Sequence, residues 1–337
     1  GYGLGVRFLY DRMPPGVDPL GPESILGFVP GLLTGAGVLF GGRFMVVGKS
    51  PLTGGWGDAN CGGHFGPLLR SAGLDGLFFT GISDHPVYLM VDGDRVTIKD
   101  AGHLWGLETA ETEERLKAEV GRGAHVVSIG PAGEQRSLIA AIITDRGRAA
   151  ARSGLAAVMG AKRLKAVVVR GEKHLPIHDK EALTELSRAY GQIFKTENRS
   201  PLSPILFRMT NMLAPIMRWL RMKPSGPADA IIHLYRKYGT SGATAFTTEL
   251  GDAPVWNWRG VAVRDFPLSR SKRISDDAVI EHQVKSYHCR YCPVGCGGIV
   301  HLEGETYTVE QAHKPEYETL AAFGPLLLND NLEAIVK

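Results

Sequence analysis

The sequence shows little charge imbalance and few cysteines. Its 337 residues include 38 basic and 35 acidic side chains, for a formal net charge of +3, and no polybasic block stands out. Nucleic acid is therefore not an expected partner. The four cysteines do not resemble a disulfide framework, because three of them lie within eight residues and a chain of this size needs no covalent staples. With no evident signal peptide, this pattern favours a reducing, cytoplasmic compartment.

Long uncharged runs are also rare. The exception is residues 25–42, "ILGFVPGLLTGAGVLFGG", which carry no charge. This run contains six glycines and one proline, and it is barely long enough to cross a bilayer. We therefore expect buried strands and turns there, and no membrane span.

Glycine, by contrast, is plentiful, with 43 residues concentrated in the first half. Short apolar runs between these glycines predict strands, and "HPVYLMVDGDRVTIKDAG" predicts a hairpin whose turn is at Asp92 and Gly93. The stretch "ETAETEERLKAEVG" predicts a surface helix that ends at Gly121. We therefore expect a first half built from short strands and tight turns.

The second half is expected to be mostly helical. The stretch "EKHLPIHDK" resembles a linker, and Asp179 is suited to cap the helix that follows it. Residues 206–222, "LFRMTNMLAPIMRWLRM", predict two helices separated at Pro215 and packed on their own domain. Contact with a membrane surface or a partner is the alternative for this basic, Met-rich segment. The predicted domains are residues 1–172 and 173–337.

One apparent nucleotide-binding motif does not hold. Gly48, Lys49 and Ser50 resemble the end of a phosphate-binding loop, but the required spacing places a glycine where the chain has Arg43. A proline also follows at once, where such a loop begins its helix. What remains is an arginine with Asn60, Gly62 and further glycines, which could bring a guanidinium and bare backbone N–H groups to a polar ligand. A glycine-rich strand junction without a ligand is the alternative.

The stretch "TDRGRAAARSGLAAVMGAKRLKA" places Arg148 and Arg152 four residues apart. In a helix they would share one face, and the small residues Ala149 and Ala151 would leave almost no bulk between them. Such a surface suits a bulky anion. The alternative is a small-residue helix packed on a sheet, with both arginines in solvent.

The stretch "CRYCPVGC" carries the strongest local signal. Cys289, Cys292 and Cys296 form a C-x2-C-x3-C pattern, which favours three ligands of a [4Fe–4S] cluster. A redox C-x-x-C pair without metal is the weaker alternative. Downstream, Glu316 and Glu318 lie two residues apart, and a carboxylate near a redox loop could act as a general base. Glutamate is also a common solvated surface residue.

Taken together, six stretches resemble the tungsten-dependent aldehyde:ferredoxin oxidoreductase family in residues, order and spacing. The resemblance implies an α+β fold, with an N-terminal two-sheet β-rich pterin-binding domain followed by the start of a multihelical domain. It also implies a tungsten bis-pterin cofactor, in which molybdenum rarely replaces tungsten, and a nearby [4Fe–4S] cluster. The stretches are "GGRFMVVGKSPLTGG", "CGGHFGPLLRSAGLDGLFFTG", "SIGPAGE", "TDRGRAAARSGLAAVMGAKRLKAVVVRG", "CRYCPVGC" and "PEYETLAAFGPLLLND".

The resemblance also assigns roles to single residues. The acidic residue beside the metal corresponds to Glu318, and Cys61 falls in the pterin loop, where it is not the expected fourth cluster ligand. That ligand, a leading strand and a C-terminal half are expected outside this chain. The positions that match pterin contacts are Arg43, Asn60, Gly62, Arg148, Ala149, Ala151 and Arg152, and those that match cluster ligands are Cys289, Cys292 and Cys296.

The expected activity is oxidation of an aldehyde to a carboxylic acid with water. Electrons would pass through the cluster to ferredoxin or a partner subunit, and a homodimer is one candidate assembly. Glu318 would act as the base, and burial beside "TLAAFG" would raise its pKa. One alternative is a family reductase that acts on a carboxylic acid or an aromatic acyl-thioester. Another is a cluster-bearing electron-transfer subunit without tungsten.

Overall fold

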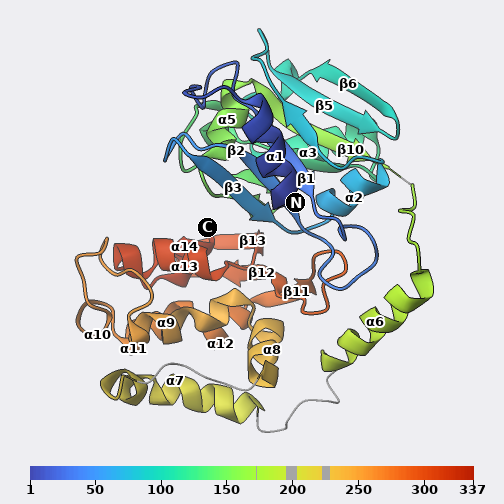
Figure 1. The fold of residues 1–337 in the computed structure, drawn as a ribbon. Helices are drawn as coiled ribbons and strands as arrows, with labels where there is room; N and C mark the ends of the chain where they lie inside the picture. Colours follow the sequence, from blue (N-terminus) through green and yellow to red (C-terminus); the bar gives the residue numbers. More distant parts are fainter. Residues whose placement is uncertain (172, 195–202, 222–227) are drawn as a thin grey trace. The chain divides into compact units, whose positions relative to one another are not determined.

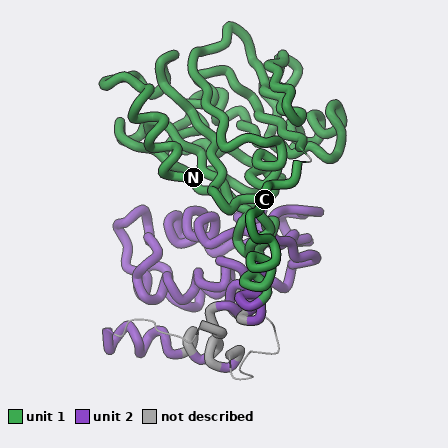
Figure 2. The backbone as a smooth tube through the Cα atoms, turned by 45° about the vertical axis from the view of Figure 1, so that its right-hand side comes forward, with its two compact units in different colours: residues 1–188, 289–292 green, residues 189–288, 293–337 purple. Residues whose placement is uncertain are grey.

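The computed structural model describes residues 1–171, 173–194, 203–221 and 228–337. Its internal contacts divide the chain into two compact units, shown in Figure 2. The first unit contains residues 1–188 and 289–292, and the second contains residues 189–288 and 293–337. The mixed helix-and-sheet class is confirmed. The domain boundary between residues 172 and 173 stays a prediction, and the helix α6 (Lys180–Ile193) runs across the division between the two units.

The described strands of the first unit form two sheets (Figure 1). The four-stranded sheet has the order β3-β2-β1-β4 and is antiparallel throughout. The six-stranded sheet has the order β6-β5-β10-β7-β8-β9, and only the pair β5–β10 is parallel. The strands are β1 (Leu26–Pro30), β2 (Phe44–Lys49), β3 (Trp56–Cys61), β4 (Leu77–Phe79), β5 (Val87–Asp92), β6 (Arg95–Asp100), β7 (His125–Ser128), β8 (Ile142–Thr144), β9 (Arg148–Ala150) and β10 (Leu164–Arg170).

Helices cover these sheets in layers. The helix α1 (Tyr2–Arg12) shares one apolar cluster with one face of the four-stranded sheet. Residues of α2 (Phe65–Ser71) and α5 (Leu155–Ala161) form a larger core with both sheets. The helix α3 (Thr109–Val120) packs on the other face of the six-stranded sheet. Alternate residues of β10 enter the last two cores, so this central strand is buried on both faces.

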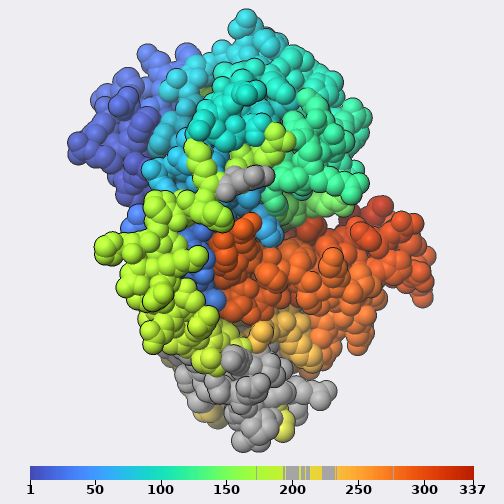
Figure 3. Space-filling model, turned by 90° about the vertical axis from the view of Figure 1, so that its right-hand side faces the viewer, coloured from blue at the N-terminus to red at the C-terminus, as the bar shows by residue number. Residues whose placement is uncertain are grey.

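Most strands predicted in the first half are confirmed. The hairpin β5–β6 is present, but Asp92 pairs with Arg95, so its two-residue turn consists of residues 93 and 94 and not of Asp92 and Gly93. Gly93 supplies the positive φ that such a turn needs. Figure 3 shows this part of the surface in cyan. Every residue of β6 is exposed. Helix α3 ends at Gly121, as predicted.

In the second unit, the predicted helices are accompanied by strands that the sequence did not predict. The strands β11 (Gln283–Tyr287), β12 (Gly297–Glu303) and β13 (Thr308–His313) form an antiparallel sheet. The helices include α7 (Ser203–Trp219), α8 (Ala228–Lys237), α9 (Thr244–Leu250), α10 (Ala262–Asp265), α11 (Leu268–Ser271), α12 (Asp276–Ile280), α13 (Tyr317–Phe323) and α14 (Leu332–Val336). Residues of α10, α12, α13 and α14 share one apolar core, in which Phe266, Ile274 and Leu320 are buried.

Two expectations for the helical part have opposite outcomes. Asp179 caps α6 as predicted, since its carboxylate accepts a hydrogen bond from the backbone N–H of Ala182 at 2.8 Å. The break at Pro215 is wrong, because α7 is one helix that continues through this proline. In the described ranges, no helix combines the length and apolar character needed to cross a bilayer.

Lys162 gives the first unit a pH-dependent stability. Its side chain is buried, and its ammonium donates to the carbonyl oxygens of Ser24 at 2.6 Å and Gly81 at 3.2 Å. Burial lowers the pKa of Lys162 from 10.5 to about 8. Between about pH 8 and pH 10.5, the Lys162 side chain is protonated in the unfolded chain and neutral in the folded chain. The contribution of Lys162 to the unfolding free energy therefore rises with pH in this range.

We expect the unfolding free energy of the wild type, measured relative to Lys162→Met, to rise with pH above about pH 8. The expected gain by about pH 10 is on the order of 1–2 kcal/mol, allowing for partial solvent screening. Urea denaturation of both proteins across this range measures it. If the difference in unfolding free energy between the wild type and Lys162→Met stays constant or falls as the pH rises, the proposed effect of burying a charged Lys162 is contradicted.

Candidate cofactor site

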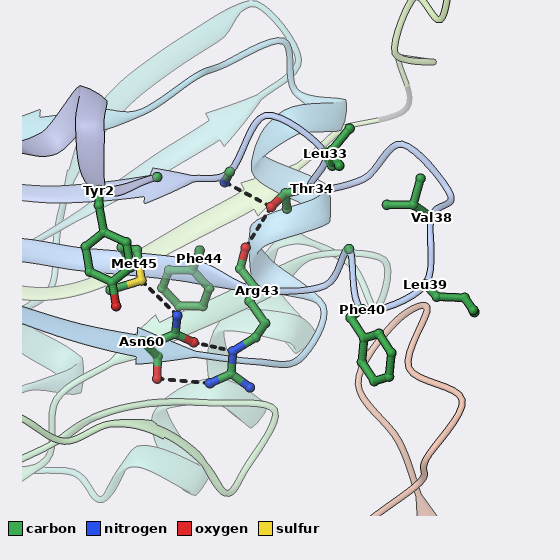
Figure 4. A pocket seen from close by; sticks show the side chains of 13 residues that line it. Tyr2, Leu33, Thr34, Val38, Leu39, Phe40, Arg43, Phe44, Met45 and Asn60 are labelled. Atoms are coloured by element: carbon green, nitrogen blue, oxygen red, sulfur yellow. Dashed lines mark hydrogen bonds between the residues drawn. The ribbon is translucent and has the colours of Figure 1, made fainter. Parts of the chain in front are cut away.

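An arginine–asparagine pair lies where β2 and β3 run side by side (Figure 4). The Arg43 guanidinium donates through Nε to the side-chain oxygen of Asn60 and through Nη2 to its backbone carbonyl at 3.4 Å. The hydroxyl of Thr34 fixes the backbone of this arginine by donating to the Arg43 carbonyl at 2.8 Å. Both side chains of the pair are exposed. They can therefore meet a ligand without rearrangement of the sheet.

Arg43 and Asn60 also line a cavity of about 290 Å³ in the first unit. Much of the remaining lining is apolar and comes from β2 and from the segment between β1 and β2. Figure 4 shows Leu33, Val38 and Phe40 along this segment, with the guanidinium lying closer to Asn60. The cavity thus combines an apolar wall with a cation that binds phosphate or carboxylate well.

The segment Cys289–Cys292 lies beside the glycine loop that follows the C-terminal end of β3. The backbone N–H of Arg290 donates to the Gly63 carbonyl at 3.3 Å, and the Phe40 N–H donates to the Tyr291 carbonyl at 2.9 Å. A Cβ on Gly62 would lie 2.7 Å from the Sγ of Cys289 and 3.4 Å from an Arg43 nitrogen. Only glycine at position 62 therefore allows the thiol to approach this closely.

The motif that contains Arg148 and Arg152 begins in the strand β9, beside the glycine loop, and it does not form the predicted helix. Arg148 and Ala149 belong to this strand, and α5 begins only at Leu155, so the predicted helical face of Arg148 and Arg152 is wrong. The Ser153 hydroxyl ties the segment to β3, donating to the Asp58 carbonyl at 3.0 Å and accepting from its N–H at 3.2 Å.

The side chains of this segment differ in exposure. Those of Ala149, Ala151 and Arg152 are exposed, whereas Arg148 is half-buried. The Cγ of Arg148 would lie 3.6 Å from a Cβ on Gly63, so the β9 motif and the glycine loop are neighbours. All the residues that the sequence assigned to cofactor binding therefore belong to the first unit, and Arg148 lies beside the glycine loop.

Cys61 has the environment of a core thiol. Its side chain is 1% exposed and lies in the core shared by both sheets and α2. Burial raises the pKa of the Cys61 thiol to about 12, while Arg43 lowers this pKa and Cys289 raises it by smaller amounts. A thiol that holds its proton is a poor metal ligand, which agrees with its exclusion from the predicted cluster.

The remaining predicted site residues belong to the second unit. Cys296 is one of them, whereas Cys289 and Cys292 belong to the first unit. Glu316 precedes α13 and accepts a hydrogen bond from the Thr240 hydroxyl at 2.5 Å. Glu318 lies in the first turn of α13 and is exposed. The burial expected for Glu318 is therefore wrong for the described residues.

Comparison with known proteins decides the family. The family model "Aldehyde ferredoxin oxidoreductase, N-terminal domain" matches residues 1–171, and "Aldehyde ferredoxin oxidoreductase, domains 2 & 3" matches residues 221–337. The chain belongs to the aldehyde ferredoxin oxidoreductase family. It is 36% identical to tungsten-containing aldehyde ferredoxin oxidoreductases of Pyrococcus abyssi and Thermococcus kodakarensis, with 99% of this chain covered in each case. It covers 49% of each of these relatives, so it spans about half their length.

The names of two other relatives indicate different reactions. An aliphatic sulfonate oxidoreductase, WOR-like subunit, of Pyrococcus furiosus is 29% identical over 96% of this chain and 48% of its own length. The active-site complex BamBC of benzoyl coenzyme A reductase has a similar structure, with a TM-score of 0.71 and 28% identity. That match covers 99% of this chain and 47% of the BamBC chain. The family therefore includes oxidoreductases of more than one substrate class.

The sequence missed several contributors to the site. Thr34 and Met45 support the Arg43–Asn60 pair, since the Asn60 amide donates to the Met45 sulfur at 3.0 Å. Period-two alternation in β2 and β3 could have indicated that Met45 and Asn60 are opposite each other. No local signal predicted that Cys289 would approach Gly62, because this contact joins segments more than two hundred residues apart.

Proposed function

We propose that this protein forms the tungstopterin- and cluster-binding part of an oxidoreductase that converts an aldehyde and water to a carboxylic acid, two protons and two electrons. The electrons would pass through a [4Fe–4S] cluster to ferredoxin or a partner subunit. The observation that carries the proposal is the proximity of an exposed Arg43–Asn60 pair to Cys289, across Gly62, within one unit. The proposed cofactor-binding pair and one proposed cluster cysteine therefore both approach Gly62.

The residues of the first unit suit an extended anionic cofactor such as a pterin phosphate. Arg43 and Arg152 offer exposed guanidinium groups, and Asn60 offers an amide beside Arg43. Ala149 and Ala151 are exposed and small, so a flat ligand can lie against this backbone without displacing a side chain. Gly62 and Arg148 complete the set of pterin contacts that we propose. Tungsten is the metal named for the close relatives, and molybdenum is the less favoured alternative.

Each protein group has a separate task in the proposed reaction. When bound, the tungsten centre supplies a Lewis acid and a two-electron acceptor. Cys289, Cys292 and Cys296 hold iron as thiolates, with a fourth ligand from elsewhere. The Glu318 carboxylate accepts the proton that water loses as it adds to the carbonyl carbon. Arg43 and Asn60 bind and orient the cofactor without changing protonation.

A viologen-linked assay with a panel of aliphatic and aromatic aldehydes tests the proposal. It requires the protein purified anaerobically from the organism that makes it. We expect aldehyde-dependent dye reduction and carboxylic acid as the product. The sulfonate and benzoyl coenzyme A relatives favour one second candidate, a reductase of an acid or aromatic acyl-thioester. No aldehyde activity, together with reduced-dye-dependent consumption of such an acid or thioester, would favour that candidate and overturn the first.

Gly62→Ala is expected to reduce iron retention while leaving the fold intact. The backbone at Gly62 does not have a positive φ, so alanine is conformationally acceptable, but its Cβ would lie 2.7 Å from the Cys289 sulfur. The thiol must then move away from the position proposed for cluster binding. The iron content and cluster absorbance of anaerobically purified protein measure the effect.

Gly55→Ala is the matched control, because only the Thr53 hydroxyl lies within 4 Å of a Cβ at Gly55, at 3.8 Å. We expect this variant to keep wild-type iron content. Equal iron content in Gly62→Ala and Gly55→Ala would argue against a cluster ligand at Cys289.

A further inference from the structure

Two histidines and one aspartate converge in the first unit, apart from the cysteine motif. The Nδ1 of His64 lies 3.2 Å from Oδ2 of Asp145, and the Nδ1 of His125 lies 3.0 Å from Oδ1 of the same carboxylate. The imidazole rings are 5.2 Å apart between centroids and inclined by 22°. One ligand atom from each residue lies within 4.8 Å of the other two, and all three residues are half-buried. In the described chain, no other group of three histidine, cysteine or acidic side chains meets this distance.

Three separate elements supply these side chains. His64 directly precedes α2, His125 begins β7, and Asp145 starts the turn between β8 and β9. The His64 backbone N–H also donates to Oδ2 of Asp145 at 2.8 Å. The cluster therefore joins the glycine loop that follows β3 to the turn that precedes the β9 arginine motif.

The backbone around Asp145 is held in an unfavourable conformation. Asp145 and Arg146 have φ values of 48° and 62°, a left-handed region that costs a non-glycine residue free energy. The buried Glu113 accepts the Arg146 N–H at 2.9 Å and so helps to fix the turn. A Cβ on Gly63 would lie 2.3 Å from the Asp145 carboxylate, and Gly63 has a φ of 105°. Backbone strain at Asp145 and Arg146, together with the missing side chain at Gly63, thus allows this carboxylate to reach the two imidazoles.

The donor set and its spacing suit a metal ion. Imidazole nitrogen and carboxylate oxygen are ordinary ligands of Zn²⁺, and two histidines with one carboxylate also bind Fe²⁺. Around a tetrahedral ion with bonds of about 2.0–2.2 Å, neighbouring ligand atoms are roughly 3.3–3.6 Å apart. The observed separations of 3.2 Å and 3.0 Å differ from this by a few tenths of an ångström. Small side-chain rotations would therefore admit an ion.

We propose that His64, His125 and Asp145 bind one divalent transition-metal ion of the Zn²⁺ or Fe²⁺ class. This site is separate from the tungsten and iron–sulfur sites and does not depend on the proposed aldehyde oxidation. The ion is structural: it fixes Gly63 and the β8–β9 turn relative to each other. Through these segments it positions the cofactor residues Gly62 and Arg148.

Cobalt titration tests the site directly. The protein should be the full chain with Cys289→Ser, Cys292→Ser and Cys296→Ser, because these thiols would otherwise bind the probe. After removal of metals with a chelator, Co²⁺ is added, and its visible d–d absorption is recorded together with the heat of Zn²⁺ binding. We expect one ion per chain and no thiolate-to-metal charge-transfer band. His125→Ala and Asp145→Ala in the same background should weaken binding at least 100-fold.

His85→Ala is the matched control, since the ring of His85 faces Asp100 at 3.9 Å in an exposed pair. It should bind Co²⁺ as the parent does. Near-ultraviolet circular dichroism verifies folding, and His64→Gln replaces any variant that fails to fold. Absence of saturable binding in the folded parent, or equal binding in the His125→Ala and parent proteins, would overturn the proposal. Either result would identify a purely hydrogen-bonded cluster.

Discussion

Lys165→Met is expected to destabilise the first unit by about 3–5 kcal/mol. Lys165 and Glu134 form an ion pair whose side chains are 0% and 2% exposed. The ammonium also donates to the Leu107 carbonyl at 2.8 Å, and the carboxylate accepts the Gly106 N–H at 2.9 Å. Methionine would fill a similar volume but would leave the carboxylate buried without its cation, and that uncompensated charge is the main cost.

Urea denaturation followed by far-ultraviolet circular dichroism measures this change. The double variant Lys165→Met, Glu134→Gln should recover most of the loss, because it removes both charges and keeps an acceptor for the Gly106 N–H. Arg115→Met is the surface control. Arg115 and Glu111 form an exposed pair, which should contribute less than about 1 kcal/mol. A loss below about 1 kcal/mol in Lys165→Met itself would show that the buried pair does not stabilise this unit.

Glu318→Gln is expected to lower kcat by about 10²–10⁴-fold while tungsten and iron content stay unchanged. Glutamine is close to glutamate in size but cannot take a proton from water. The measurement is the viologen-linked aldehyde assay, with metal analysis of the same sample. The reduction should appear in kcat more than in KM, because the proton transfer belongs to the chemical step.

Glu316→Gln separates the two neighbouring carboxylates. Glu316 accepts the Thr240 hydroxyl, a role that a glutamine oxygen retains, so this variant should keep near-normal turnover. Wild-type turnover in Glu318→Gln would remove its proposed role. Loss of turnover in Glu316→Gln alone would transfer that role to Glu316.

Local features of the sequence predicted much of the first unit. The hairpin β5–β6 follows from the apolar runs on either side of the Asp-Gly dipeptide. The end of α3 follows from Gly121, whose φ of 106° would be costly for any other residue. Arg43 and Asn60 were selected from composition and resemblance, and pairing of β2 with β3 places them together. Such features depend on neighbours in sequence or across one hairpin.

The wrong secondary-structure predictions concern segments whose local sequence is typical of a different structure. Residues 148–152 have the small side chains of a close-packed helix, yet β9 forms because the preceding turn is completed by two non-glycine residues with positive φ, Asp145 and Arg146. The sheet β11-β12-β13 was missed because β12 begins with two glycines, which weaken its strand propensity. In α7, a proline expected to break the helix is accommodated within it.

The His64–His125–Asp145 cluster shows a different limit. Its members come from three elements separated by up to 81 residues, and none stands in a metal-binding motif. Only the packing of both sheets with α2 brings these segments together. The same limit applies to the approach of Cys289 to Gly62.

Metal analysis of the anaerobically purified protein tests the central claim most directly. Inductively coupled plasma mass spectrometry should find stoichiometric tungsten and about four iron atoms per chain, apart from the ion proposed at His64, His125 and Asp145. Arg43→Ala should lose tungsten and pterin with its iron retained, and Cys289→Ser should lose iron. Iron and acid-labile sulfide without tungsten, molybdenum or pterin in the wild-type protein would contradict the account and indicate an electron-transfer subunit.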